Sequence, residues 1–515
     1  MTKSSLACAF LLLVADAFGV AERMLTTDNG AWTSEAWTNG LIWSGRVVPA
    51  HGEQATLRPG ASKGNLVVWL DEDLTNGFYQ VLHAAGDGTS VTFDGNGHDV
   101  VPPTLDATSE ISYIADRNVF WVQPNHGGNY GQYFRFQNVD SRRAPYRLTN
   151  PRYRFAVRDG CAELAFLRGT YNVYDPDGEG STSRVVYLFT DSSTIPTEVT
   201  FAPGTVWRVG AVDARGNSVS NRLVMAGADV HVYGGWNDTY SGSAAATASL
   251  VELTDDTRLT IDGSLAYRSY ASYAAARLFS VADGSCLTTK GGVEFATPKT
   301  TLRVDRATWD ASGNPNAWAT FDLFCSQAAV GSRVAFTNAT LTLGKAPLTM
   351  GPDASDVLPL PVSFVASHLV TATASVSFRR ADVTVEGSRI ESVSSDGASL
   401  NVGYGASVRL CDSAVSNMTM RCGGVAESQV ESGATIVFEN GSHSLNRLEV
   451  GTSGATGSGP SVVRLLDGTV AIAGGADVGV AVPGALELKG GRLTAAHVNG
   501  GREGTKAEAA TARLS

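Results

Sequence analysis

The sequence predicts an all-β protein, a right-handed parallel β-helix (β-solenoid) preceded by a β-rich N-terminal capping region. Gly accounts for 56 of the 515 residues and charged residues for only 17%, a composition that suits short strands and frequent turns. A strand start and a turn unit also recur along the second half of the chain. Recurrence at such spacing, without helical periodicity, predicts stacked coils of short strands.

Residues 1–21 have the pattern of a secretory signal peptide. Lys3 supplies the positive charge, Leu6–Val14 the apolar core and Gly19–Ala21 a small-residue cleavage site. We expect the mature chain to be secreted or displayed at the cell surface. We expect no transmembrane segment in it, because no later apolar run approaches the ~18 residues that span a bilayer.

Residues 22–200 are predicted to form a β-rich region that is a cap or the first coils. Its opening is rich in tryptophan, with Trp32, Trp37 and Trp43 close together. We expect these side chains to close the end of the hydrophobic column, since terminal repeats need cover. The alternative is that they stack on sugar rings in a noncatalytic carbohydrate-binding module.

Residues 201–500 are predicted to be the solenoid repeats, followed by a short polar tail at 501–515. Six Gly-Ala pairs lead into alternating segments, as where Val408 and Leu410 share one face and Arg409 lies on the other. Such alternation indicates a strand with one buried face. The pairs begin at Gly227, Gly397, Gly405, Gly433, Gly475 and Gly484.

A turn unit follows these strands, with the order apolar, any, turn residue, small, any, apolar. Asn, Asp and Gly at its third and fourth places tolerate left-handed backbone angles, so we expect the chain to turn there. Its first residues are Phe336, Phe378, Leu410, Phe438, Leu465 and Leu488. Because these intervals are unequal, we expect loops to protrude from the longer ones, above all between Phe336 and Phe378.

The strands that start with Gly-Ala, such as the segment 400–410, resemble the passenger regions of bacterial autotransporters and secreted adhesins. The resemblance implies a parallel β-helix with a structural or adhesive role at the cell surface. Autotransporters of the usual design end in a membrane β-barrel, whereas residues 501–515 are short and polar.

Charge and cysteine usage narrow the classes of partner. The net charge is −11 with scattered acidic residues, so no basic stripe is available for nucleic acid. An extracellular glycan or a surface protein is the expected partner.

Cys411 and Cys422 could meet on adjacent strands or remain two separate buried thiols.

Two fragments resemble motifs of pectate lyases, which are β-helix enzymes. Val68–Asp73 is similar to their Trp-x-Asp-His stretch but has Glu72 in place of His, and Arg143–Arg147 is one residue short of their Arg-x-Pro-x-x-Arg motif. We therefore assign no catalytic residue and favour a noncatalytic chain. A glycan-active, polysaccharide lyase-like enzyme remains the alternative.

A calcium loop is the one metal site that the sequence suggests. Asp175, Asp177 and Glu179 place oxygens at alternate positions before Gly180, as in the first half of such a loop. Position twelve, however, is Val186, so another ligand would be needed. An acidic hairpin turn is the alternative, and no other cofactor is indicated.

Overall fold

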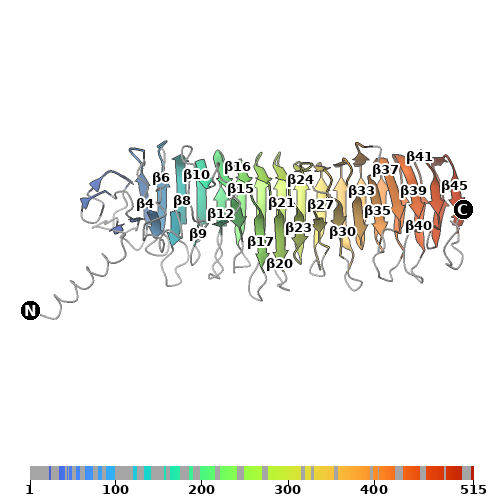
Figure 1. Ribbon diagram of the computed structural model, residues 1–515, viewed down its shortest axis with the longest axis horizontal. Coiled ribbons are helices and arrows are strands. Elements are labelled where there is room, and N and C mark those ends of the chain that lie inside the picture. The colour runs from blue at the N-terminus through green and yellow to red at the C-terminus, as the bar shows by residue number, and fades with distance from the viewer. Residues whose placement is uncertain are drawn as a thin grey trace, which may run out of the picture. The chain divides into compact units, whose positions relative to one another are not determined.

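The computed structural model divides into two compact units. The first contains residues 1–239, 244–251 and 257–260, and the second contains residues 240–243, 252–256 and 261–515. The structure describes residues 22–24, 34–40, 43, 46–48, 54–57, 64–73, 79–83, 89–98, 120–123, 133–140, 156–157, 163–173, 185–188, 198–214, 221–240, 249–269, 276–314, 319–325, 330–352, 358–394, 398–403, 405–423, 433–452, 460–480, 483–500 and 512–514. These residues are almost entirely β-strand and turn, and they include a parallel β-solenoid of about 10 turns (Figure 1).

In the first unit each strand pairs in parallel with a strand of the next coil. The β10 strand shows this clearly, because it pairs with β8 on one side and with both β12 and β13 on the other. The strands are β1 (Glu22–Met24), β2 (Ser34–Ala36), β3 (Gln54–Leu57), β4 (Gly64–Trp69), β5 (Tyr79–His83), β6 (Thr89–Asp94), β7 (Phe120–Gln123), β8 (Tyr133–Asp140), β9 (Ala156–Val157), β10 (Glu163–Val173), β11 (Val185–Tyr187), β12 (Glu198–Phe201), β13 (Thr205–Val209), β14 (Ala211–Asp213), β15 (Arg222–Ala226), β16 (Asp229–Val232) and β17 (Trp236–Tyr240). The strands β18 (Leu250–Thr254) and β19 (Arg258–Ile261) contain residues of both units.

The core of the first unit contains stacked aromatic side chains. The rings of Phe166 and Phe201 stack with their centroids 5.0 Å apart, and Trp207 meets both of them edge-on at 4.8 Å. All three are buried. Offset and edge-on ring pairs of this kind stabilise a core beyond the area that they bury.

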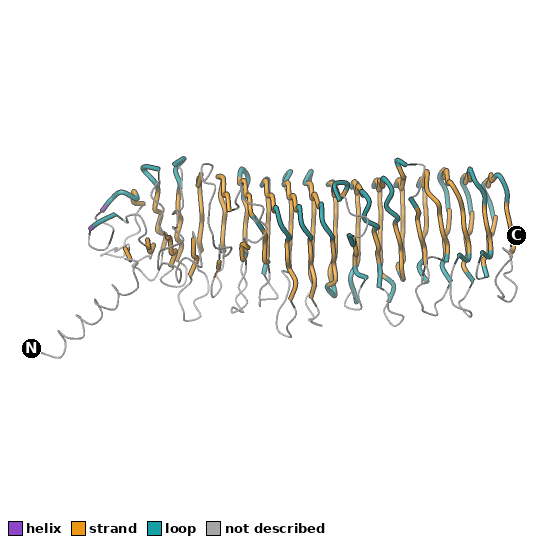
Figure 2. The backbone as a smooth tube through the Cα atoms, viewed as in Figure 1, coloured by secondary structure: helices purple, strands orange, loops and turns teal. Residues whose placement is uncertain are grey.

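In the described residues of the second unit, successive coils contribute three strands each, and these form three parallel sheets. Figure 2 shows strands of successive coils lying side by side. The first sheet contains β21 (Arg277–Ala282), β24 (Thr300–Asp305), β27 (Arg333–Thr337), β30 (Leu360–Val365), β33 (Ala381–Glu386), β36 (Ser407–Cys411), β38 (Thr435–Phe438), β40 (Ser461–Leu465), β43 (Gly484–Leu488) and β46 (Ala512–Leu514). The second contains β22 (Cys286–Thr289), β25 (Thr308–Ala311), β28 (Thr340–Leu343), β31 (His368–Thr371), β34 (Arg389–Ser392), the first halves of β37 (Ala414–Cys422) and β39 (Ser442–Val450), β41 (Thr469–Ile472) and β44 (Arg492–Ala495). The third contains β20 (Leu265–Ser269), β23 (Val293–Ala296), β26 (Phe321–Leu323), β29 (Leu348–Met350), β32 (Val376–Arg379), β35 (Ser399–Gly403), the second halves of β37 and β39, β42 (Ala476–Val478) and β45 (Val498–Gly500).

The strands alternate as the sequence predicts. In β33, Val383 and Val385 are buried while Asp382, Thr384 and Glu386 are exposed. Successive coils place apolar side chains in register, so that Phe336 stacks on Phe364 with centroids 4.9 Å apart and planes 3° from parallel. The prediction of a parallel β-solenoid is confirmed.

The predicted turn units do form corners between strands. Asn338 and Asp412 have φ of 47° and 48°, and Gly441, Gly468 and Gly491 also have positive φ. The predicted strand starts are confirmed as well, since a strand begins at or directly after each described Gly-Ala pair.

The predicted repeat intervals are wrong between Phe336 and Leu410. Phe336 pairs with Phe364, Phe364 with Val385 and Val385 with Leu410, so the chain has two further copies of the unit, beginning at Phe364 and Val385. Phe378 lies in β32, at a different corner of the coil. The long interval is therefore built of further coils, and the real coils at this corner are 21 to 28 residues long.

Candidate functional site

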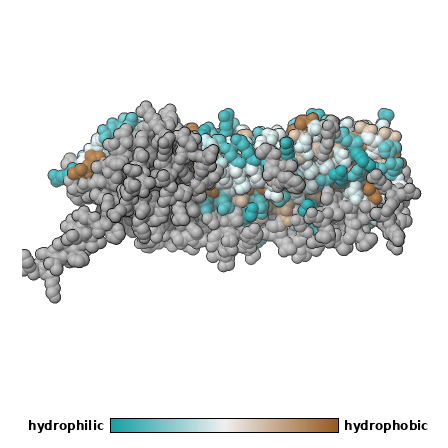
Figure 3. Space-filling view, in the orientation of Figure 1, coloured by the Kyte–Doolittle hydropathy of each residue, from teal (hydrophilic) through white to brown (hydrophobic). Residues whose placement is uncertain are grey.

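The outer faces of the second unit carry charged side chains that are paired between neighbouring coils. Arg268 binds Glu294 at 2.5 Å, Arg409 binds Glu439 at 2.7 Å and Lys290 binds Asp262 at 2.7 Å. On the face that Figure 3 shows, the described side chains of this unit are mostly hydrophilic or neutral, with apolar ones scattered. Each pair neutralises a carboxylate and links two coils.

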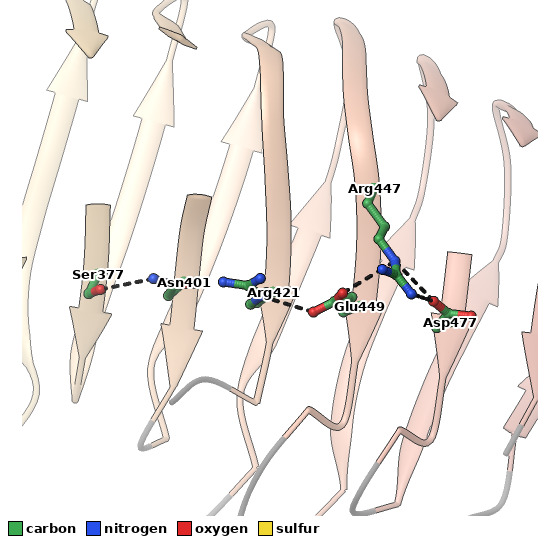
Figure 4. A network of polar contacts seen from close by, with 6 residues as sticks. All are labelled: Ser377, Asn401, Arg421, Arg447, Glu449 and Asp477. Carbon is green, nitrogen blue, oxygen red and sulfur yellow. Dashed lines mark hydrogen bonds and ion pairs between the residues drawn. The ribbon is translucent and has the colours of Figure 1, made fainter. Parts of the chain in front are cut away.

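A polar array lies on the third sheet, where side chains of successive coils are in register. We call it the polar ladder, and Figure 4 shows most of it. Its members are Ser377 in β32, Asn401 in β35, Arg421 in β37, Glu449 with Arg447 in β39, Asp477 in β42 and Asn499 in β45. Parallel strands lie about 4.8 Å apart, so one ladder position follows another at this spacing.

Charged hydrogen bonds hold the C-terminal part of the ladder together. Arg421 Nε donates to Glu449 Oε2 at 2.9 Å, and Arg447 Nε lies 3.2 Å from Glu449 Oε1. Arg447 Nε also donates to Asp477 Oδ2 at 3.1 Å, and Asn499 Nδ2 donates to Asp477 Oδ1 at 2.9 Å. Glu449 therefore bridges two arginines, and Asp477 is bound from both neighbouring coils.

These bonds fix the ionisation of the ladder. Burial alone would raise the pKa of Asp477, but the hydrogen bonds from Arg447 and Asn499 outweigh it and hold that pKa below its usual range. The same bond raises the pKa of Arg447. On the first sheet, the hydrogen bond from Arg464 lowers the pKa of Glu487 in the same way.

The ladder is suited to hydrogen bonding. A general acid at neutral pH needs a carboxyl group with a raised pKa, whereas Asp477 and Glu487 are displaced in the opposite direction. The ladder's donors and acceptors lie in register along the third sheet.

The lyase-like fragment at Val68–Asp73 does not form a reactive cluster. Val68 is buried in β4, and Asp71 accepts hydrogen bonds from the backbone and hydroxyl of Thr38. Asp73 lies 3.2 Å from His98 Nδ1. These contacts join neighbouring coils of the first unit. The second fragment, Arg143–Arg147, lies outside the described residues.

Two of the predicted tryptophans are core residues. Trp37 and Trp43 are each 1% exposed, their ring centroids are 4.9 Å apart, and Trp43 Nε1 donates to the Trp37 carbonyl at 2.9 Å. Neither ring presents a face to a sugar, so the stacking alternative is wrong for these two residues. Trp32 lies outside the described residues.

The predicted calcium residues Asp175, Asp177 and Glu179 all lie outside the part of the chain that the structure describes. Within that part, no three His, Cys, Asp or Glu side chains are grouped to hold a metal ion.

Cys411 and Cys422 lie in different sheets, at the ends of β36 and β37, and both are free thiols. Cys422 faces the core, where burial raises the pKa of its thiol to about 12. Cys411 is partly exposed at the end of β36, and burial is also the main cause of its raised pKa. They do not form a disulfide.

No family model, curated protein or solved structure matches this chain. The described residues contain no helix with the length and apolar character needed to cross a bilayer. Any function must therefore be argued from the sequence, the fold and the polar ladder.

Sequence reasoning missed the polar ladder. Its members are outward-facing residues in coils of unequal length, so they show no fixed spacing. A signal was nevertheless present, because the corner residues Leu410 and Phe438 are partners in register and the ladder residues Arg421 and Glu449 lie at the same spacing after them.

Proposed function

We propose that this chain is exported and acts outside the cell as a noncatalytic β-solenoid with a structural or adhesive role. The signal-peptide pattern of residues 1–21 supports export, and the resemblance of the repeats to autotransporter passengers supports display at the surface. In this role residues 1–21 are removed.

The observation that carries the proposal is the polar ladder. It spreads hydrogen-bonding groups over six coils and does not gather them in one place. Its carboxylates Glu449 and Asp477 are already bound by arginine. Such a surface fits an extended partner, an extracellular glycan or a surface protein, better than it fits a reaction at a single bond.

The test has two parts. Cells that express the full chain should release it or carry it on their surface, with an N-terminus near Glu22 by sequencing. The purified protein should then be incubated with insoluble neutral and acidic polysaccharides and with intact cells, with and without calcium, and scored for retention and for new reducing ends. Retention without cleavage supports the proposal. Cleavage, or retention of the protein in the cytoplasm, contradicts it.

A further inference from the structure

One core position of the second sheet holds a titratable side chain. From β28 to β41, the strands of this sheet place one inward-facing residue of each coil in a single row. His443 of β39 lies in this row and is 2% exposed. The other members are apolar and buried, and they are Leu341, Leu369, Ile390, Val415 and Val470. A ring that can take up a proton therefore interrupts an apolar column.

The position accommodates the neutral form of the imidazole. Its Nδ1 accepts a hydrogen bond from the Val415 backbone N–H at 3.2 Å, so this nitrogen carries no proton. Its Nε2 is buried and makes no hydrogen bond within the described part of the chain. A protonated ring has two N–H groups and no acceptor, so a proton on Nδ1 would break the bond with Val415 and leave a cation in the core.

The strands packed around His443 place no carboxylate beside the ring to balance such a charge. The strands β38 and β41 contain no titratable residue. Cys422 of β37 faces the core, where its thiol is neutral because burial raises its pKa to about 12. The charged residues of β37, β39, β40, β42 and β43 are paired with one another on the outer faces of the first and third sheets, and they are Arg421, Arg447, Glu449, Arg464, Asp477 and Glu487.

The corner before His443 supplies no counter-charge either. Its carboxylates face outward, where Glu439 binds Arg409 and Asp412 accepts from the Asn440 amide. Burial lowers the pKa of His443, and the backbone carbonyl of Asn440 opposes this shift only in part. The ring therefore stays neutral in the closed structure in mild acid, in which an imidazole open to water is protonated.

The third sheet of the same coils is held together differently. The strand β39 continues from the second sheet into the third, where Glu449 is bound by Arg421 and Arg447. Asp477 of the next coil is bound by Arg447 and Asn499, and these bonds hold its pKa below its usual range. Asp477 therefore stays charged in mild acid. A fall in pH acts on the second-sheet part of β39 and leaves these bonds of its third-sheet part in place.

We propose that His443 is an acid-sensitive release point of the solenoid. Uptake of a proton by its ring opens the second sheet between β37 and β41, while the polar ladder holds the third sheet of the same coils together. In a solenoid each coil contacts only its neighbours, so a loss of stability at one coil is not shared by the whole column. The inference is independent of the proposed adhesive role.

The test is amide hydrogen exchange of the full chain at pH 7 and pH 5, followed by mass spectrometry of overlapping peptides. Exchange times are scaled for the intrinsic effect of pH on exchange. Because the ring titrates at 6.5 when open and at about 4 when closed, the equilibrium constant for opening should rise about 20-fold from pH 7 to pH 5. Peptides from the second-sheet parts of β37, β39 and β41 should show this rise, above all at the amide of Val415. Peptides from the third-sheet parts of β37, β39 and β42 should not.

Two variants remove the proposed proton acceptor. His443→Asn keeps an acceptor for Val415 and does not titrate, and His443→Val gives this coil the aliphatic residue that Val415 and Val470 supply in the neighbouring coils. Both should lose the response to acid. His368→Asn is the matched control, because His368 lies on the outer face of the same sheet, 38% exposed and 2.9 Å from Glu391, so this variant should respond as the parent does.

Three results would overturn the inference. The first is equal acceleration of exchange in the second and third sheets, which would mean that acid loosens the coils as a whole. The second is the absence of any acceleration at pH 5 in the parent protein. The third is an undiminished response in both His443 variants, which would assign the acid sensitivity to another group.

Discussion

Gly441 lies directly against Ser413 of the preceding coil. The two residues form an isolated parallel bridge, and a Cβ atom on Gly441 would be 2.1 Å from the Ser413 carbonyl oxygen. The φ of Gly441 is 104°, in the region that side chains rarely adopt. Both the contact and the backbone angle therefore require glycine at this corner.

We expect Gly441→Ala to lower the free energy of unfolding by about 2 to 5 kcal/mol, from left-handed strain and overpacking together. Gly387 is the matched control, because it occupies the same corner two coils earlier with φ of 56°, and a Cβ atom added to it would meet no atom within 4 Å. Gly387→Ala should cost only about 1 to 2 kcal/mol. Urea unfolding followed by circular dichroism measures both, and equal losses would show that the Ser413 contact is unimportant.

The sequence predicts this corner because a turn depends mainly on the residue types at the turn itself. Asn338 and Asp412 are residue types that tolerate positive φ, and both adopt it. Ala366 also has φ of 47° at the same corner, although alanine gives no such signal. There the bonds to neighbouring coils, from Ala366 N to the Glu386 carbonyl, outweigh the local preference.

The register of the coils is less predictable, because it depends on contacts between residues more than 20 positions apart. Val385–Ile390 fits the turn unit, with Gly387 in the turn place, but Phe378 is close by and was counted instead. Even with that unit counted, spacing alone does not align Asn401 with Arg421, because the chain between corner and ladder is longer after Val385 than after Leu410. The short-range sequence pattern thus predicts strands and corners. The candidate site depends on which residues of successive coils come into register, and that is decided by the length of each coil.

Buried serines stabilise the same corner. Ser388 Oγ accepts from the Ser367 backbone N–H at 2.9 Å and donates to the Glu386 carbonyl at 2.8 Å. Ser388→Ala would leave the buried N–H of Ser367 unpaired, so we expect a loss of about 1 to 3 kcal/mol in the free energy of unfolding. Ser444→Ala, on an exposed outer position, should change it little. Chemical denaturation of both variants checks this, and a neutral Ser388→Ala would contradict the role of the hydroxyl.

The ion pairs of the polar ladder should contribute more to the free energy of unfolding than ion pairs between exposed side chains. Glu449 is largely buried and bridges Arg421 and Arg447, so Glu449→Gln removes two charged bonds and should cost about 1 to 3 kcal/mol. Glu439→Gln breaks the pair with Arg409, whose side chain is 59% exposed, and should cost only a small fraction of that. Thermal unfolding of both variants, at low and at high salt, measures the two losses of stability. A larger loss in the Glu439 variant would reverse this order.

His443 should make the fold sensitive to acid. It lies in the core beside Phe438, with ring centroids 4.7 Å apart, and its Nδ1 accepts from the Val415 backbone N–H at 3.2 Å. Burial lowers the pKa of His443 to about 4, against an ordinary value of 6.5. As the pH falls below 6.5, the imidazole of His443 becomes protonated in the unfolded chain but stays neutral in the folded chain. The free energy of unfolding should therefore drop by about 3 kcal/mol between pH 7 and pH 4, and the contribution of this group should level off as the pH falls below 4.

His443→Asn isolates this effect, because the Asn Oδ1 can replace Nδ1 as acceptor for Val415 and does not titrate. Carboxylates such as Asp477 also weaken the fold in acid, but they do so equally in both proteins. The measurement is the difference in free energy of unfolding between the two proteins at several pH values from 7 to 4. That difference should shift in favour of the variant as the pH falls, because only the parent protein must keep a neutral imidazole in its core. Parallel curves over this range would mean that His443 is protonated as readily in the fold as in the unfolded chain.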